Sequence, residues 1–115
     1  MQIAQRLIGD VTVLQLEGRL LLDDGFEPLS LALNEAIAGG QRKLLLDFQG
    51  VTHLDSAGVG LIASRYATLC RQDGQLRLCN LQPRTYKVFH TTKLLTVFQP
   101  FTSVEEALRA FEPAQ

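Results

Sequence analysis

The segment KLLLDF, residues 43–48, places large apolar side chains on both sides of an extended chain, at Leu44, Leu45 and Leu46. Successive side chains of a strand point to opposite faces, so a strand that is apolar on both faces belongs in the middle of a sheet. At least one of those faces must be covered by helices. The segment therefore favours an α/β fold with this strand near its centre.

Apolar periodicity predicts alternating strands and helices in the rest of the chain. Two β-prone runs surround Gly9-Asp10, a turn pair typical of an antiparallel hairpin. In chain order the pattern then predicts a helix that ends at Gly39-Gly40, the strand KLLLDF, a helix over residues 56–72, the strand QLRLCNL, a short helix that begins at Pro83, the strand KLLTVFQ and a last helix capped by Ser103. Helices between strands imply mainly parallel pairing. Residues 1–115 are therefore predicted to form one α/β domain, with a mixed, mostly parallel sheet of about five strands and about four helices.

The composition excludes several classes of function. The net charge is −1, and lysine and arginine are scattered along the chain, so we expect neither nucleic-acid binding nor membrane binding. No signal peptide is recognisable, and no apolar stretch approaches the ~20 residues that span a bilayer. Cys70 and Cys79 have no Cys or His companions at metal-ligand spacing, so we expect two buried thiols and no metal site. The chain is interpreted as a reduced, cytoplasmic protein.

The segment LDSAGVG, residues 54–60, carries the candidate chemistry. As a nucleophile, Ser56 would need a base and an orienting acid that converge on it in series, and residues adjacent in sequence, such as His53 and Asp55, rarely do so. The segment also lacks the G-x-S-x-G elbow. We therefore expect no enzymatic activity, and interpret His53 as an ordinary polar loop residue and His90 as a surface or half-buried one.

The same segment continues into GVGLIA, residues 58–63, which formally matches the dinucleotide-binding pattern G-x-G-x-x-A. Three features argue against that role. Asp55 and Ser56 intervene before the glycines, the acidic ribose partner expected ~20 residues later is replaced by Cys79-Asn80, and the chain is too short for the usual two-half fold. The glycines are interpreted as allowing a helix to approach the sheet closely, and no cofactor is expected.

Ser56 or Asp55 can cap the following helix, a contribution of ~1 kcal/mol. Ser56 can also be a substrate, because a phosphoryl group would add ~ −1.5 to −2 charges at the helix end that favours anions. The fold would tolerate this charge, whereas a partner docked on a neutral serine would lose contact. A thousandfold loss of affinity corresponds to only ~4 kcal/mol. The position is therefore suited to a phosphorylation switch.

The long segment LLLDFQGVTHLDSAGVGLIASRYATLCRQDGQLRLCNL resembles the STAS domain family, in particular its anti-sigma factor antagonists of the sporulation and general-stress type. It shares with them an apolar strand ending in Asp, the motif D-S-[small]-G-[L/V]-G, an amphipathic helix and G-x-L-x-L, and the likeness covers nearly the whole chain. The resemblance implies a bacterial, non-enzymatic regulator. The serine after the motif aspartate, here Ser56, would be phosphorylated by an anti-sigma factor that is also a serine kinase. The unphosphorylated form would bind that kinase and release the sigma factor, and a metal-dependent serine phosphatase would restore it.

The resemblance also implies a partner-binding surface, which consists of Asp55, Ser56, Ala57 and Gly58 together with Asp23 and Asp24 of the LLDDG loop. This loop faces the same end of the domain in the family, where its carboxylates could meet basic residues of the kinase; a solvated turn is the alternative. Ala57 stands where some members carry a second hydroxyl, which leaves Ser56 as the acceptor. Two other functions stay open: a STAS subunit of a lipid-transport ABC complex that works without phosphorylation, and a nucleotide-sensing STAS module.

Overall fold

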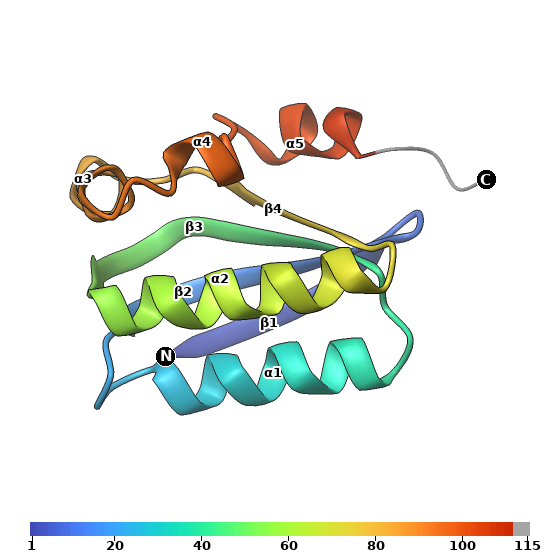
Figure 1. The fold of residues 1–115 in the computed structure, drawn as a ribbon, viewed down its shortest axis with the longest axis horizontal. Helices are drawn as coiled ribbons and strands as arrows, with labels where there is room; N and C mark the ends of the chain where they lie inside the picture. The colour runs from blue at the N-terminus through green and yellow to red at the C-terminus, as the bar shows by residue number, and fades with distance from the viewer. Residues whose placement is uncertain (112–115) are drawn as a thin grey trace.

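The computed structural model describes residues 1–111, and in them a four-stranded sheet of order β1-β2-β3-β4 has helices on both faces (Figure 1). The elements are β1 (Gln2–Ile8), β2 (Val11–Leu20), α1 (Phe26–Ala38), β3 (Lys43–Leu54), α2 (Ser56–Arg71), β4 (Gln75–Cys79), α3 (Pro83–Thr91), α4 (Leu95–Phe98) and α5 (Val104–Ala110). β1 and β2 pair antiparallel, whereas β3 is parallel to both β2 and β4. The predicted α/β class, hairpin and mixed sheet are confirmed.

The central position predicted for the leucine-rich segment is also confirmed. Leu44 and Leu46 pack into the larger core with α1 and α2, and Leu45 packs into a second core beneath α5. All three leucines are fully buried. The two cores lie on opposite faces of the sheet, since side chains alternate along β3.

The strand predicted at KLLTVFQ is wrong. Lys93 adopts a left-handed backbone with φ of 63°, and the following residues form the short helix α4. Leu94, Leu95 and Phe98 have the i, i+1, i+4 spacing of one helical face, and Phe98 packs edge-to-face on Phe89 with ring centroids 5.7 Å apart. The sheet in the described residues therefore has four strands, not about five, and five helices accompany it. Phe101, farther along, forms an isolated bridge to Cys79.

One of the two predicted buried thiols is exposed. Cys79 is fully buried on β4, and this burial raises the pKa of its thiol to about 12. Cys70 is exposed, because it lies on α2 one residue past the buried Leu69 and so falls at the edge of the apolar face. Both cysteines are free thiols. Their reactivities should therefore differ strongly.

Two predicted helix boundaries are explained by local chemistry. Ser103 caps α5, and its hydroxyl oxygen accepts a hydrogen bond of 3.0 Å from the backbone N–H of Glu106. Pro83 opens α3 as the first helical residue, where its missing N–H is harmless. Within residues 1–111 no helix combines the length and apolarity needed to cross a membrane.

Candidate functional site

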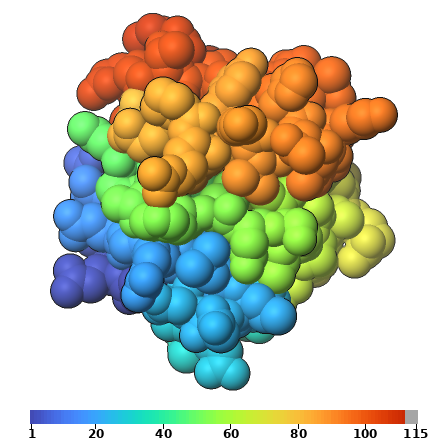
Figure 2. Space-filling model, turned by 90° about the vertical axis from the view of Figure 1, so that its left-hand side faces the viewer, coloured from blue at the N-terminus to red at the C-terminus, as the bar shows by residue number. Residues whose placement is uncertain are grey.

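Ser56 lies at one end of the molecule, where β3 ends and α2 begins. Figure 2 faces this end: residues around 50–60, in green, lie between the blue loop near residues 20–27 and the orange helix α3. The parallel strands β2 and β3 both end here, since Leu20 is paired with Leu54. Three segments far apart in sequence thus form one surface.

The cap of α2 is Asp55, not Ser56. The Asp55 carboxylate accepts a hydrogen bond of 2.9 Å from the backbone N–H of Gly58 through Oδ1. Ser56 is the first residue of the helix and is exposed. Its hydroxyl makes no hydrogen bond to any residue from 1 to 111, so a modifying enzyme could reach it without disrupting an internal bond.

The second oxygen of Asp55 ties the LLDDG loop to the same site. Oδ2 accepts a hydrogen bond of 2.9 Å from the backbone N–H of Leu22. The loop itself is closed by two backbone hydrogen bonds between Leu21 and Asp24, of 2.8 and 3.0 Å. The structure therefore brings Asp23 and Asp24 to the end of the molecule that carries Ser56, as the family resemblance implied.

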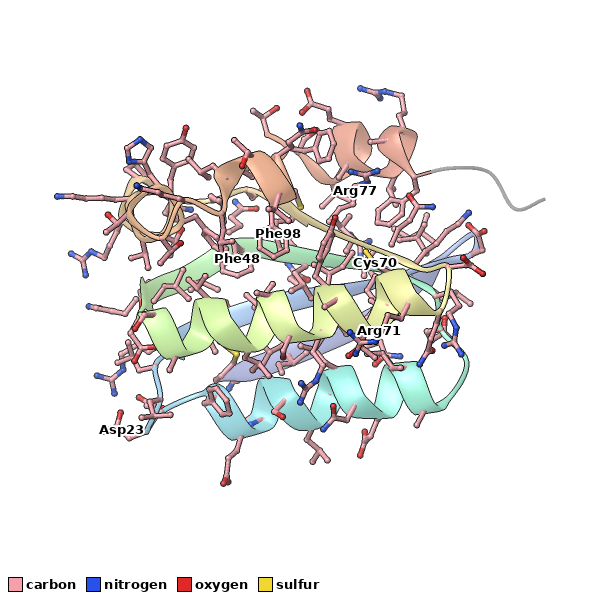
Figure 3. The ribbon with its side chains drawn as sticks, in the orientation of Figure 1. Asp23, Phe48, Cys70, Arg71, Arg77 and Phe98 are labelled. Carbon is pink, nitrogen blue, oxygen red and sulfur yellow. The ribbon has the colours of Figure 1, made fainter. Side chains whose placement is uncertain are left out.

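The two loop carboxylates differ in their surroundings. Asp24 forms an ion pair with Arg19, with Nη2 and Oδ2 2.8 Å apart. Asp23 is exposed and projects away from the molecule at its outer end (Figure 3). No ion pair involves Asp23 among residues 1–111, so it is the carboxylate that is free to meet a partner.

The motif glycines have unequal roles. A Cβ on Gly58 would lie 2.8 Å from Leu20 Cγ and 2.9 Å from Leu54 Cδ1, so this glycine does allow α2 to approach the sheet. The same interpretation is wrong for Gly60, since a Cβ there would meet nothing within 4 Å. Gly60 is exposed, one helical turn after Ser56. Ala57, half-buried, completes the first turn.

Leu22 is a site residue that the sequence reading missed. Its side chain is 65% exposed, more than any other large apolar side chain described. It borders a hollow of about 430 Å³ that is lined by Met1, Leu22, Asp23, Asp24, Gly25, Phe26, Glu27 and Pro28. An exposed leucine held in place by its backbone bond to Asp55 is a suitable anchor for a protein partner. The sequence signal that could have indicated an exposed leucine here is the run of three leucines at 20–22, because a tight turn cannot bury all three side chains.

His53 is in β3 rather than in a loop, which corrects the sequence interpretation. Its Nε2 lies 2.7 Å from Nη1 of Arg84, and its Nδ1 lies 3.0 Å from the hydroxyl oxygen of Thr52. Arginine has no acceptor, so Nε2 must accept and Nδ1 carries the proton. Both ring nitrogens are therefore engaged by Thr52 and Arg84 rather than by Ser56. His90 is exposed on α3, within the range expected for it.

The described residues hold no group of three or more His, Cys, Asp or Glu side chains that could bind a metal ion.

Comparisons with known proteins all point to one protein family. The family model for the STAS domain matches residues 2–107. The Bordetella bronchiseptica protein BtrV, whose name places it among anti-sigma factor antagonists, is 31% identical over 88 residues, which cover 76% of each chain.

Solved structures agree with that match. The anti-sigma factor antagonist SpoIIAA in its unphosphorylated form superimposes with a TM-score of 0.79 and 25% identity, over 97% of this chain and 100% of that one. The phosphorylated form of Bacillus SpoIIAA gives a TM-score of 0.73, also at 25% identity, over 94% and 97% of the two chains. Both similarities extend over almost the whole of the present chain.

Proposed function

Because the chain belongs to the STAS domain family, we propose that it acts as an anti-sigma factor antagonist. In its unphosphorylated form it binds an anti-sigma factor that is also a serine kinase, and the sigma factor is released. Phosphorylation of Ser56 ends this binding, and a metal-dependent serine phosphatase restores it. The protein itself acts by binding rather than by catalysis.

The observation that carries this proposal is the exposed, unengaged hydroxyl of Ser56 at the first position of α2. Its neighbour Asp55 already supplies the cap, so phosphorylation would remove no bond that the fold uses. The positive end of the helix would moderate the added charge of about −2. The domain would thus stay folded while the uncharged hydroxyl at the centre of this surface was replaced by a dianionic group.

The partner-binding surface is proposed to extend from Asp55, Ser56, Ala57 and Gly58 to the LLDDG loop. Leu22 supplies an apolar anchor and Asp23 a free carboxylate, whereas Asp24 is already paired with Arg19. Gly58 contributes indirectly, since it seats α2 against Leu20 and so sets the height of Ser56 above the sheet. An apolar anchor beside a free charge is a common arrangement at protein interfaces.

Incubation with the cognate kinase and ATP tests the proposal. Mass spectrometry should find one phosphate, located on Ser56. Ser56→Ala should abolish labelling and keep kinase binding, while Ser64→Ala, a matched change on the same helix, should leave both intact. Ser56→Asp should weaken binding by about tenfold or more with little change in stability, because a carboxylate favours the helix N-terminus. Labelling at another residue, or stable co-purification with an ABC-type ATPase in place of the kinase, would contradict the proposal.

A further inference from the structure

Charge is distributed unevenly along the second half of the chain. No aspartate or glutamate occurs between Asp73 and Glu105, yet this stretch contains Arg77, Arg84, Lys87 and Lys93. Arg77 is used internally: its guanidinium lies 5.9 Å from the ring centre of Phe101 and 5.8 Å from that of Phe111 (Figure 3). Of the other three cations, Arg84 is hydrogen-bonded to His53, and the ammonium groups of Lys87 and Lys93 have no hydrogen bond or ion pair with any residue from 1 to 111.

These three cations lie on α3 and directly after it. Arg84 and Lys87 are one turn apart on the helix, His90 follows after another turn, and all are exposed, as is Lys93. No salt bridge involves any of them among residues 1–111. We refer to Arg84, Lys87, His90 and Lys93 as the α3 basic face.

The fold gains little from this arrangement. Like charges one turn apart on a helix repel each other, and a cation in the first turn, such as Arg84, opposes the helix dipole. Two partly exposed apolar side chains lie on the same segment, Tyr86 at 48% and Val97 at 43%. Tyrosine and arginine, both exposed here at Tyr86 and Arg84, are enriched at protein interfaces.

We propose that the α3 basic face docks an acidic segment of a protein partner. The face adjoins the Ser56 surface, because Arg84 is hydrogen-bonded to His53 at the end of β3, and Figure 2 shows α3 next to that end. The opposite side of Ser56 is acidic, with Asp23 and Glu27 beside the hollow near Leu22. A partner that covers both sides must therefore present an acidic segment to α3 and basic groups to the LLDDG loop.

The geometry favours a peptide over a nucleic acid or a membrane. α3 has nine residues, a length of about 14 Å at 1.5 Å per residue. A longer polyanion that also crossed the Ser56 surface would meet the carboxylates of Asp55 and of Asp23 in the LLDDG loop. The net charge of −1 also opposes non-specific binding to an extended anionic surface. A short acidic segment fits the basic face without these contacts.

Nuclear magnetic resonance with the isotope-labelled protein tests this inference. A synthetic acidic peptide made of Glu and Tyr is titrated at low salt, and the shifted amide signals should gather on α3 and Lys93. The triple variant R84E/K87E/K93E should weaken the peptide's affinity by about tenfold or more, and added salt should do the same. The matched control R6E/R71E/R109E has the same net charge and should keep the affinity.

Three results would overturn the inference: no binding at low salt, shifts away from both α3 and Lys93, or an equal loss of affinity in the control variant. An oligouridylate or anionic vesicles that bind α3 more tightly than the peptide would also overturn it, in favour of a nucleic acid or a membrane. The outcome is separable from that of the phosphorylation experiment. Ser56 labelling with no peptide binding at α3 refutes the basic face alone, and peptide binding without Ser56 labelling refutes the switch alone.

Discussion

Alanine substitutions at the two glycines of α2 should change stability in opposite directions. At Gly60 a new Cβ meets nothing within 4 Å, so the substitution only removes the flexibility of glycine from a helix. This should stabilise the fold by about 0.5–1 kcal/mol. At Gly58 the new Cβ would lie 2.8 Å from Leu20 Cγ and 3.0 Å from the Leu20 carbonyl oxygen. Overpacking of this kind costs about 1–3 kcal/mol, which exceeds the helical gain.

Urea denaturation, monitored by circular dichroism, measures the change in stability of each variant. Gly60→Ala should raise the urea midpoint, and in a thermal scan 1 kcal/mol corresponds to about 4 °C in a domain of this size. Gly58→Ala should lower both quantities. A destabilised Gly60→Ala variant would refute the claim that this position is open, and a stabilised Gly58→Ala variant would refute the close contact between α2 and Leu20.

The same Gly60 variant also informs partner binding. Glycine is unfavourable in a helix interior, and no described residue packs against Gly60 in a way that would require it. It lies one turn after Ser56 on the exposed side of α2. If the backbone of the proposed kinase partner approaches α2 closely there, Gly60→Ala should weaken the binding of that partner while it raises stability. Titration calorimetry checks this, and unchanged affinity would place Gly60 outside the interface.

Two further predictions concern the fold around the site and the buried thiol. Asp55→Ala removes both the cap of α2 and the hydrogen-bond acceptor for the Leu22 amide. It should therefore lower stability by about 1–2 kcal/mol and speed hydrogen exchange at the Leu22 amide. Asp55→Asn can still cap the helix, so its loss of stability should be smaller. Cys70 should react with iodoacetamide in the folded protein, whereas Cys79 should stay unmodified until unfolding. Because the folded pKa of Cys79 is raised to about 12 from an ordinary value of 9.0, its unfolded thiol ionises first. Stability should therefore fall between about pH 9 and pH 12, by up to about 1.4 kcal/mol per pH unit, and Cys79→Ala should remove this contribution. Full alkylation of native Cys79 near neutral pH would contradict its burial.

The local sequence pattern was sufficient to predict most elements of the fold. The hairpin at Gly9-Asp10, the doubly apolar strand at Leu44–Leu46 and the cap at Ser103 each depend on residues within a few positions of one another. Where two local patterns overlapped, prediction failed. The apolar residues from Leu94 to Phe98 suit both a strand and a helical turn, and the left-handed backbone at Lys93, together with packing against Phe89, selects the helix.

Part of the candidate site can likewise be predicted from adjacent residues, and part depends on contacts between distant ones. The motif D-S-x-G and its place at a strand-to-helix junction are readable from adjacent residues, and the family resemblance that they carry implies Ser56 as the phosphorylation candidate. Asp55 and Ser56 are equally good caps by residue type. In the structure Asp55 is the cap through Oδ1, and its second oxygen also accepts from the backbone N–H of Leu22, which is 33 positions away in sequence.

The sequence by itself determined the α/β class and the order of most elements, because hydrophobic period and capping chemistry act over a few residues, whereas Ser56 was singled out as a phosphorylation candidate by the resemblance to the STAS family. Only the tertiary structure decided which glycine touches the sheet, which thiol is buried and which loop carboxylate is free. It also placed the carboxylate-free stretch around α3 beside Ser56. These features depend on contacts between residues distant along the chain, and such contacts exist only once the sheet and its helices have packed.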